Sequence, residues 1–133
     1  MADRLVVDTM KLRFRANTLR LRLNQTEVAS LSQNHPLKER VDFPGNTALQ
    51  YTLSVGDTVE ASATFVNGNI SIELPENSVH EWSTSATIGL YFNLPVTDNI
   101  LKIAVEKDLV CIDGPPEEID PDAYPRPNEQ ANC

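Results

Sequence analysis

The chain has 133 residues, 41% hydrophobic and 23% charged, enough for one globular domain with a core and too few for two ordinary ones. Its formal net charge of −8 argues against nonspecific nucleic-acid binding. No apolar run approaches the roughly 18 residues of a membrane-spanning helix, and the acidic residues near the N-terminus argue against a secretory signal. We therefore expect a cytoplasmic protein without a membrane partner.

The charge is distributed unevenly along the chain. Residues 1–105 hold 11 acidic and 9 basic side chains, whereas residues 106–133 hold 8 acidic and 2 basic ones. The excess of acid therefore belongs to the C-terminal end. We expect a leader at 1–9, a single domain at 10–112, and an acidic, proline-rich tail at 113–133.

The first predicted element is a basic hairpin. Apolar and basic residues alternate over 10–15 and over 19–23, with the period of two that half-buried strands show. Ala16-Asn17 is the predicted two-residue turn between the strands. This turn places Lys11 opposite Arg22, Arg13 opposite Arg20, and Arg15 opposite Thr18.

A short helix is predicted after the hairpin. Asn24 and Glu27 have the spacing of a capping box, in which each side chain hydrogen-bonds the backbone N–H of the other residue. The helix should run to about Ser32 and bury Val28 and Leu31.

The later elements repeat this order. Asn67-Gly68 is the strongest short hairpin signal in the chain, and a second helix is predicted to begin after Pro75. The remaining strands are predicted at 38–43, 48–55, 59–66, 69–74, 86–94 and 100–108.

Two halves of the chain match when the residue number is shifted by 51. This shift carries six apolar positions onto six others: Phe14, Leu19, Leu21, Leu23, Val28 and Leu31 onto Phe65, Ile70, Ile72, Leu74, Val79 and Trp82. After Pro95 the second half has one inserted residue, and the shift becomes 52. We therefore predict a tandem duplication of a ββαββ unit, with repeat 1 at 10–55 and repeat 2 at 59–108.

The predicted fold is mainly β (α+β), with about eight strands and two short helices. Apolar strand faces must be buried, and a pseudo-twofold, barrel-like sheet plugged by the helices would bury them and remove exposed edges. A two-layer sandwich is the alternative. The predicted core residues are Phe14, Leu21, Val28, Phe65, Ile72, Trp82, Ile103 and Val105. Truncation of Phe65 to alanine should then cost about 3–5 kcal/mol.

The basic hairpin is the best candidate for a binding site, through its residues Lys11, Arg13, Arg15, Arg20 and Arg22. Like charges that face each other across strands are destabilising, and the shifted positions in the second half are not basic. With no internal counter-charge expected, the cluster indicates an anionic counterpart: the acidic tail, a phosphate or carboxylate ligand, or an acidic protein. The competing interpretation is a solvated face whose arginine stems shield the sheet.

The tail is predicted to bind the hairpin reversibly. Its acidic run from Glu117 to Asp122 should be attracted to the hairpin cations and act as a gate that an external acidic partner displaces. Ile119 and Tyr124 are the expected apolar contact points of the tail. The resulting first hypothesis is a non-catalytic binding module, whose ligand and oligomeric state the sequence leaves open.

The sequence leaves two alternative functions open. Cys111 and Cys133 could serve a metal- or thiol-handling protein, although no Cys-x-x-Cys spacing supports a metal site and no cofactor is predicted. Lys107, at an inward position near a strand end, could serve a small enzyme. An inward lysine at a strand end must snorkel or pair with a carboxylate, and we expect such structural pairing. Four strand residues span roughly 13 Å, so Lys107 is too far from Cys111 to activate its thiol directly.

Several segments together resemble a family of small uncharacterised bacterial proteins. The segments are Met10 to Arg15, Leu19 to Leu23, Glu27-Val28, Phe43-Pro44-Gly45, Val105 to Asp108, Cys111, and an acidic stretch ending in Tyr-Pro. The resemblance covers most of residues 10–127 and implies a bacterial cytosolic origin. It implies no activity.

Overall fold

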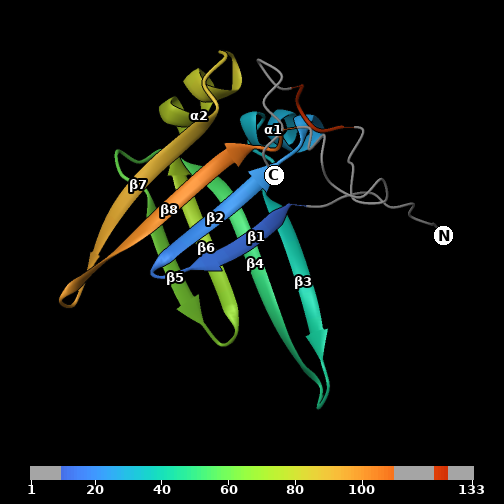
Figure 1. The fold of residues 1–133 in the computed structure, drawn as a ribbon, viewed down its shortest axis with the longest axis vertical. Coiled ribbons are helices and arrows are strands. Elements are labelled where there is room, and N and C mark those ends of the chain that lie inside the picture. Colours follow the sequence, from blue (N-terminus) through green and yellow to red (C-terminus); the bar gives the residue numbers. More distant parts are fainter. Residues whose placement is uncertain (1–9, 110–121, 126–133) are drawn as a thin grey trace.

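The computed structural model describes residues 10–109 and 122–125, and these residues form two four-stranded sheets and two helices (Figure 1). In chain order the elements are β1 (Lys11–Arg15), β2 (Thr18–Leu23), α1 (Gln25–Ser32), β3 (Leu37–Phe43), β4 (Thr47–Gly56), β5 (Ser62–Val66), β6 (Asn69–Pro75), α2 (Glu76–Ser83), β7 (Gly89–Val96) and β8 (Asn99–Lys107). All ten elements were predicted. The largest shifts are at β5 and β7, which begin at Ser62 and Gly89 instead of 59 and 86.

The hairpin β1–β2 has the predicted register. Its outer-face pairs are Lys11↔Arg22, Arg13↔Arg20 and Arg15↔Thr18. The turn places Ala16 at φ 51°, in the left-handed region that disfavours a residue with a Cβ atom. The corresponding turn between β5 and β6 uses Asn67 and Gly68, which tolerate positive φ better.

The two helices begin differently. The predicted capping box of α1 is confirmed, because the Glu27 N–H donates to Asn24 Oδ1 (2.9 Å) and the Asn24 N–H donates to Glu27 Oε1 (3.0 Å). Helix α2 begins after Pro75, which supplies no side-chain cap. Each helix directs its apolar side chains toward the sheets: Val28 and Leu31 in α1, and Val79 and Trp82 in α2.

Each sheet combines one hairpin from each half of the chain. Sheet A has the order β1-β2-β8-β7 and sheet B has the order β3-β4-β6-β5. The central pairs, β2 with β8 and β4 with β6, are parallel, and the outer pairs are antiparallel. Replacing each strand of sheet A by its counterpart in the other half gives the strand order of sheet B. A pseudo-twofold axis would produce this arrangement; the superposition of the two halves stays a prediction.

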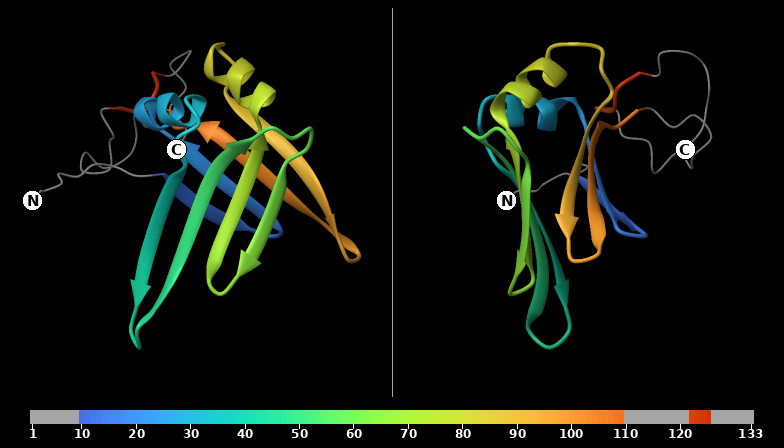
Figure 2. Two further views of the ribbon diagram at one scale, coloured as in Figure 1. Left: turned by 180° about the vertical axis from the view of Figure 1, so that it is seen from behind. Right: turned by 90° about the vertical axis from the view of Figure 1, so that its left-hand side faces the viewer.

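The preferred barrel is wrong, and the sandwich-like alternative describes the fold. Within the described residues, neither edge strand of sheet A (β1 or β7) pairs with an edge strand of sheet B. The two sheets face each other, with the helices across one end of the space between them, and diverge toward the hairpin tips (Figure 2). The helices lie over one end of the core, and the two sheets remain separate four-stranded sheets in the described residues.

The core lies between the sheets, beneath the helices. Six of the eight predicted core residues are buried: Leu21, Val28, Ile72, Trp82, Ile103 and Val105. The prediction is wrong for Phe14 and Phe65, whose side chains are 58% and 69% exposed. Both lie one residue from the end of their strands, next to the hairpin turns and away from the helices. Removing the Phe65 ring should therefore cost far less than a core aromatic would.

Candidate functional site

The outer face of sheet A collects basic side chains in rows that cross its strands. Strand β2 lies between β1 and β8, so each row continues from the hairpin onto β8. The rows are Lys11–Arg22–Glu106, Arg13–Arg20–Ala104 and Arg15–Thr18–Lys102. We call the cations of these rows the basic face: Lys11, Arg13, Arg15, Arg20, Arg22 and Lys102.

Glu106 supplies a counter-charge near one end of the basic face. Its Oε1 lies 3.3 Å from Arg20 Nε and 3.8 Å from Arg22 Nε, and its Oε2 accepts a hydrogen bond from the Tyr91 hydroxyl at 2.7 Å. Burial raises the pKa of Tyr91, and the hydrogen bond and charge of Glu106 raise it further, while Arg20 and Arg22 lower it. Tyr91 therefore remains a neutral donor to Glu106 at physiological pH.

Asp108 supplies the second counter-charge. Lys11 Nζ donates to Asp108 Oδ2 at 2.8 Å, and Asp108 is only 5% exposed. The expectation that the hairpin lacks internal counter-charges is therefore wrong for Lys11, Arg20 and Arg22. These counter-charges are present because β2 pairs in parallel with β8, which brings acids from the end of the domain beside its first hairpin.

The other three cations of the basic face form no ion pair within the described part of the chain. They are Arg13, Arg15 and Lys102. Arg15 and Lys102 flank Thr18 in one row, about 10 Å apart at their Cα atoms, since neighbouring strands are about 4.8 Å apart. Long side chains at this spacing can approach one small anion together. The uncompensated positive charge thus lies toward the turn of the hairpin.

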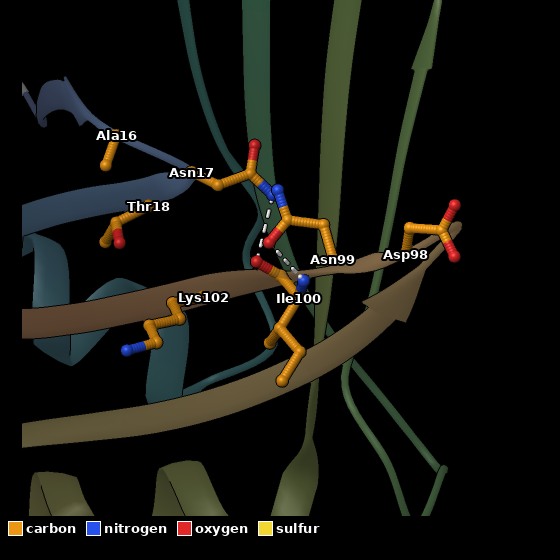
Figure 3. A pocket seen from close by; sticks show the side chains of 7 residues that line it. All are labelled: Ala16, Asn17, Thr18, Asp98, Asn99, Ile100 and Lys102. Carbon is orange, nitrogen blue, oxygen red and sulfur yellow. Dashed lines mark hydrogen bonds between the residues drawn. The ribbon is translucent and has the colours of Figure 1, made fainter.

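An open depression of about 570 Å³ borders this end of the basic face (Figure 3). Its lining comes from the β1–β2 turn and from the β7–β8 turn: Ala16, Asn17, Thr18, Asp98, Asn99, Ile100 and Lys102. The Asn17 side chain joins the two turns, because its Nδ2 donates to the Ile100 carbonyl at 2.9 Å. The Asp98 carboxylate points away from this group, so the depression keeps Lys102 and the Thr18 hydroxyl available to a ligand.

Lys107 lies at the inward position that the sequence indicated and is 6% exposed. The predicted carboxylate partner is not found among the described residues. Its Nζ donates to the Ser85 carbonyl at 2.7 Å and lies 5.9 Å and 5.3 Å from the ring centroids of Trp82 and Tyr124. Burial lowers the pKa of the Lys107 ammonium. These contacts give Lys107 a packing role, and no described carboxylate forms an ion pair with it.

The described part of the tail, residues 122–125, binds beside α1. The backbone N–H groups of Gln25 and Thr26 donate to the carbonyl and to Oδ2 of Asp122, each at 3.0 Å. A carboxylate is favourable there because the helix N-terminus carries partial positive charge. The Tyr124 N–H donates to the Asp108 carbonyl, which bears out Tyr124 as a contact point. Ile119 and the acids at 117–120 lie outside the described residues.

A family of unknown function, DUF7009, matches the chain over residues 10–128. The chain belongs to this family. The match begins immediately before β1 and spans every described strand and helix. No curated protein and no solved structure matches the chain significantly. The resemblance to a family without a known activity is thus supported, while the bacterial origin stays an expectation.

Two predicted residues of this DUF7009 protein, Cys111 and Cys133, lie outside the described residues. Within the described ranges, no group of three or more histidine, cysteine, aspartate or glutamate side chains is arranged to hold a metal ion. No described helix is both long enough and apolar enough to cross a bilayer.

Sequence reasoning missed four residues of the site in this DUF7009 protein: Tyr91, Lys102, Glu106 and Asp108. Lys102, Glu106 and Asp108 occupy one face of a predicted strand, so their common direction could have been read from the alternation. Their position beside the hairpin could not, because it depends on which strands become neighbours. That knowledge came from the parallel β2–β8 pairing.

Proposed function

We propose that the protein is a non-catalytic binding module that takes an anionic ligand or an acidic partner on the basic face. The observation that supports this proposal is the group Arg13, Arg15 and Lys102, which forms no ion pair among the described residues; Lys102 also lines the open depression. Guanidinium groups bind carboxylates and phosphates through paired, charge-assisted hydrogen bonds. Two arginines beside one lysine suit either group.

The fold itself does not need these cations. Arg13 faces Arg20 directly, and like charges at that distance oppose pairing of the strands. The counterpart pair in sheet B is Thr64↔Ser71, which builds the same hairpin without charge. The cations on sheet A thus carry a small energetic cost that an anionic partner would remove.

The acidic segment 110–121 is the proposed gate. It leaves the described structure after Leu109 and returns at Asp122, and Leu109 bridges to Tyr124, so both ends are held near Asp108 and Lys11. A loop of about a dozen residues can extend roughly 18–20 Å from its base. Arg15, four residues from Lys11 along β1, lies only about 13 Å away along the strand. The segment can therefore compete with an external anion.

The test is a titration of the full chain with inorganic pyrophosphate and, separately, with an all-glutamate peptide, followed by amide NMR. Arg13, Arg15, Thr18 and Lys102 should shift. Arg15→Glu should weaken binding about tenfold or more, the equivalent of losing one charge-assisted contact. Lys38→Glu on the outer face of sheet B is the matched control, since it changes the net charge equally. Equal weakening by both variants would reduce the effect to net charge and overturn the proposal.

The gate has its own test. Replacing Glu117, Glu118 and Asp120 together by serine should tighten pyrophosphate binding at low salt, and the gain should shrink as salt screens the competing charges. Unchanged affinity in this variant would remove the gate while leaving the basic face in place.

A further inference from the structure

Strand β1 is an edge strand, and it carries half of the basic face. It pairs with β2 on one side, and no described strand pairs with its other side. An open edge exposes backbone N–H and C=O groups that can pair with a further strand. The same short strand therefore offers both a backbone template and positive charge.

The register identifies the open backbone groups. Arg15↔Thr18 closes a two-residue turn, so Arg15, Arg13 and Lys11 direct their backbone groups toward β2. Leu12 and Phe14 then direct theirs away from the sheet. Met10 has the same phase, and its carbonyl accepts a hydrogen bond from the Tyr51 hydroxyl at 2.8 Å. That bond occupies the start of the edge and leaves Leu12 and Phe14 for a partner.

The side chains along β1 specify the chemistry of such a partner. On the outer face, Arg13 and Arg15 form no ion pair among the described residues. On the inner face, Phe14 is 58% exposed although its phase points toward the core. A strand laid beside β1 would therefore meet cations on one face and an uncovered aromatic ring on the other.

We propose that β1 accepts an extended segment of a partner protein in which acidic and apolar residues alternate. The segment would extend sheet A by one strand, place its carboxylates against Arg13 and Arg15, and cover Phe14 with its apolar side chains. This inference rests on the proposed function and names the class of its partner.

The other edges of the sheets do not offer this combination. Strand β5 has the same edge position and an exposed phenylalanine, Phe65, but its outer face carries Ser62 and Thr64. Strand β7 contains Pro95, which lacks a backbone donor. On β3, Arg40 is neutralised by Asp42 at 2.7 Å. An acidic strand would thus be attracted to β1 by its cations, and it would pair there with the outward backbone groups of Leu12 and Phe14.

The probe is a capped peptide of four glutamates alternating with three valines, measured by calorimetry and amide NMR against the full chain. A peptide of the same composition, with the glutamates in one block, is the comparison. Phe14→Pro removes the outward N–H and the ring while the pairing groups of β1 toward β2 remain, a substitution that edge strands tolerate. We expect it to weaken binding of the alternating peptide about tenfold or more.

Phe65→Pro is the matched control, since Phe65 has the same phase on the edge strand β5. It should leave peptide affinity unchanged, and melting curves should show similar stability for the two variants. Phe14→Ser, which keeps the N–H, should weaken binding less than Phe14→Pro.

The outcomes separate this inference from the proposed function. One outcome would overturn strand addition and keep the basic face as the binding site. In it, Arg15→Glu abolishes peptide binding, Phe14→Pro binds as tightly as wild type, and the alternating and block peptides bind with equal affinity. An alternating peptide whose affinity is unaffected by Arg15→Glu would overturn the proposed function itself. Preference for the alternating peptide, together with amide shifts at Leu12 and Phe14, supports strand addition.

Discussion

The hairpins β1–β2 and β5–β6 occupy counterpart positions in the two sheets, and they differ almost entirely on one face. Their inner faces bury Leu21 and Leu23 in one case and Ile72 and Leu74 in the other. Their outer faces carry, at positions related by the shift of 51, Lys11, Arg13, Arg15, Arg20 and Arg22 against Ser62, Thr64, Val66, Ser71 and Glu73.

This difference separates what folds the hairpin from what the hairpin presents. Apolar burial on the inner face is common to both hairpins, so it accounts for the shared fold. The cations occur on one hairpin alone, where Glu106 of β8 and Asp108, just after β8, are the only counter-charges among the described residues. The following predictions test that separation.

The largest effects should be equal on the two inner faces. Leu21→Ala and Ile72→Ala each remove a side chain that is at most 2% exposed, and each should destabilise the domain by about 2–5 kcal/mol. Chemical denaturation measures both. If one variant were nearly neutral while the other unfolded the protein, the two inner faces would not be equivalent and the comparison would fail.

The turn of β5–β6 should be the less tolerant of the two turns. Gly68 has φ +79°, and a Cβ atom there would lie 2.9 Å from the Ala48 carbonyl oxygen. Gly68→Ala should therefore destabilise the protein by about 1–3 kcal/mol through backbone strain and this contact. Gly45→Ala is the control, because Gly45 also has positive φ but no atom within 4 Å of the added Cβ. Its smaller loss, measured by thermal unfolding, isolates the contribution of the contact.

The turn of β1–β2 should be open to improvement. Ala16 has φ 51°, a conformation that asparagine adopts more readily than alanine. Ala16→Asn should stabilise the protein by about 0.5–1 kcal/mol, which would bring this turn closer to the Asn67 turn of the other hairpin. A loss of stability, measured by denaturation, would contradict this prediction. It would mean that the Ala16 side chain makes favourable contacts in the depression that outweigh the backbone strain.

Local patterns predicted all ten elements, since alternation, turn residues and a capping box act over a few neighbouring residues. The register of Arg13 with Arg20 and the cap at Asn24 followed from them. Alternation also assigned Phe14 and Phe65 to the inner face, but it could not predict whether their side chains are buried there. Burial also depends on how closely the opposite sheet and the helices approach at that point, and both side chains are more than half exposed.

The counter-charges were beyond prediction for a different reason. Whether Glu106 meets Arg20 depends on the choice of β8 as the neighbour of β2. That choice is a property of the whole fold, which the local alternation of residues within one strand does not encode. The sequence could therefore identify the basic hairpin but not which of its cations remain without an ion pair.

The smallest expected effect is the most direct test of the comparison. Arg13→Thr gives the hairpin the residue that β5 carries at the counterpart position, Thr64. It removes the repulsion between Arg13 and the facing Arg20, so it should stabilise the protein by about 0.2–0.5 kcal/mol at low salt. The gain should fall toward zero at about 1 M salt, where the Debye length is about 3 Å.

The same variant should lose affinity for pyrophosphate while it gains stability, and this opposition is what distinguishes a binding face from a solvated one. On a solvated face the arginine stem shields the sheet, so its removal would lower stability at every salt concentration and leave binding unchanged. Thr64→Arg supplies the reverse substitution on β5, where it should lower stability little, because Ser71 opposite is uncharged, and create no comparable anion affinity. Denaturation in low and high salt, paired with calorimetry on the same samples, measures both quantities. Stability and affinity that fall together in Arg13→Thr would return the basic hairpin to a purely structural role.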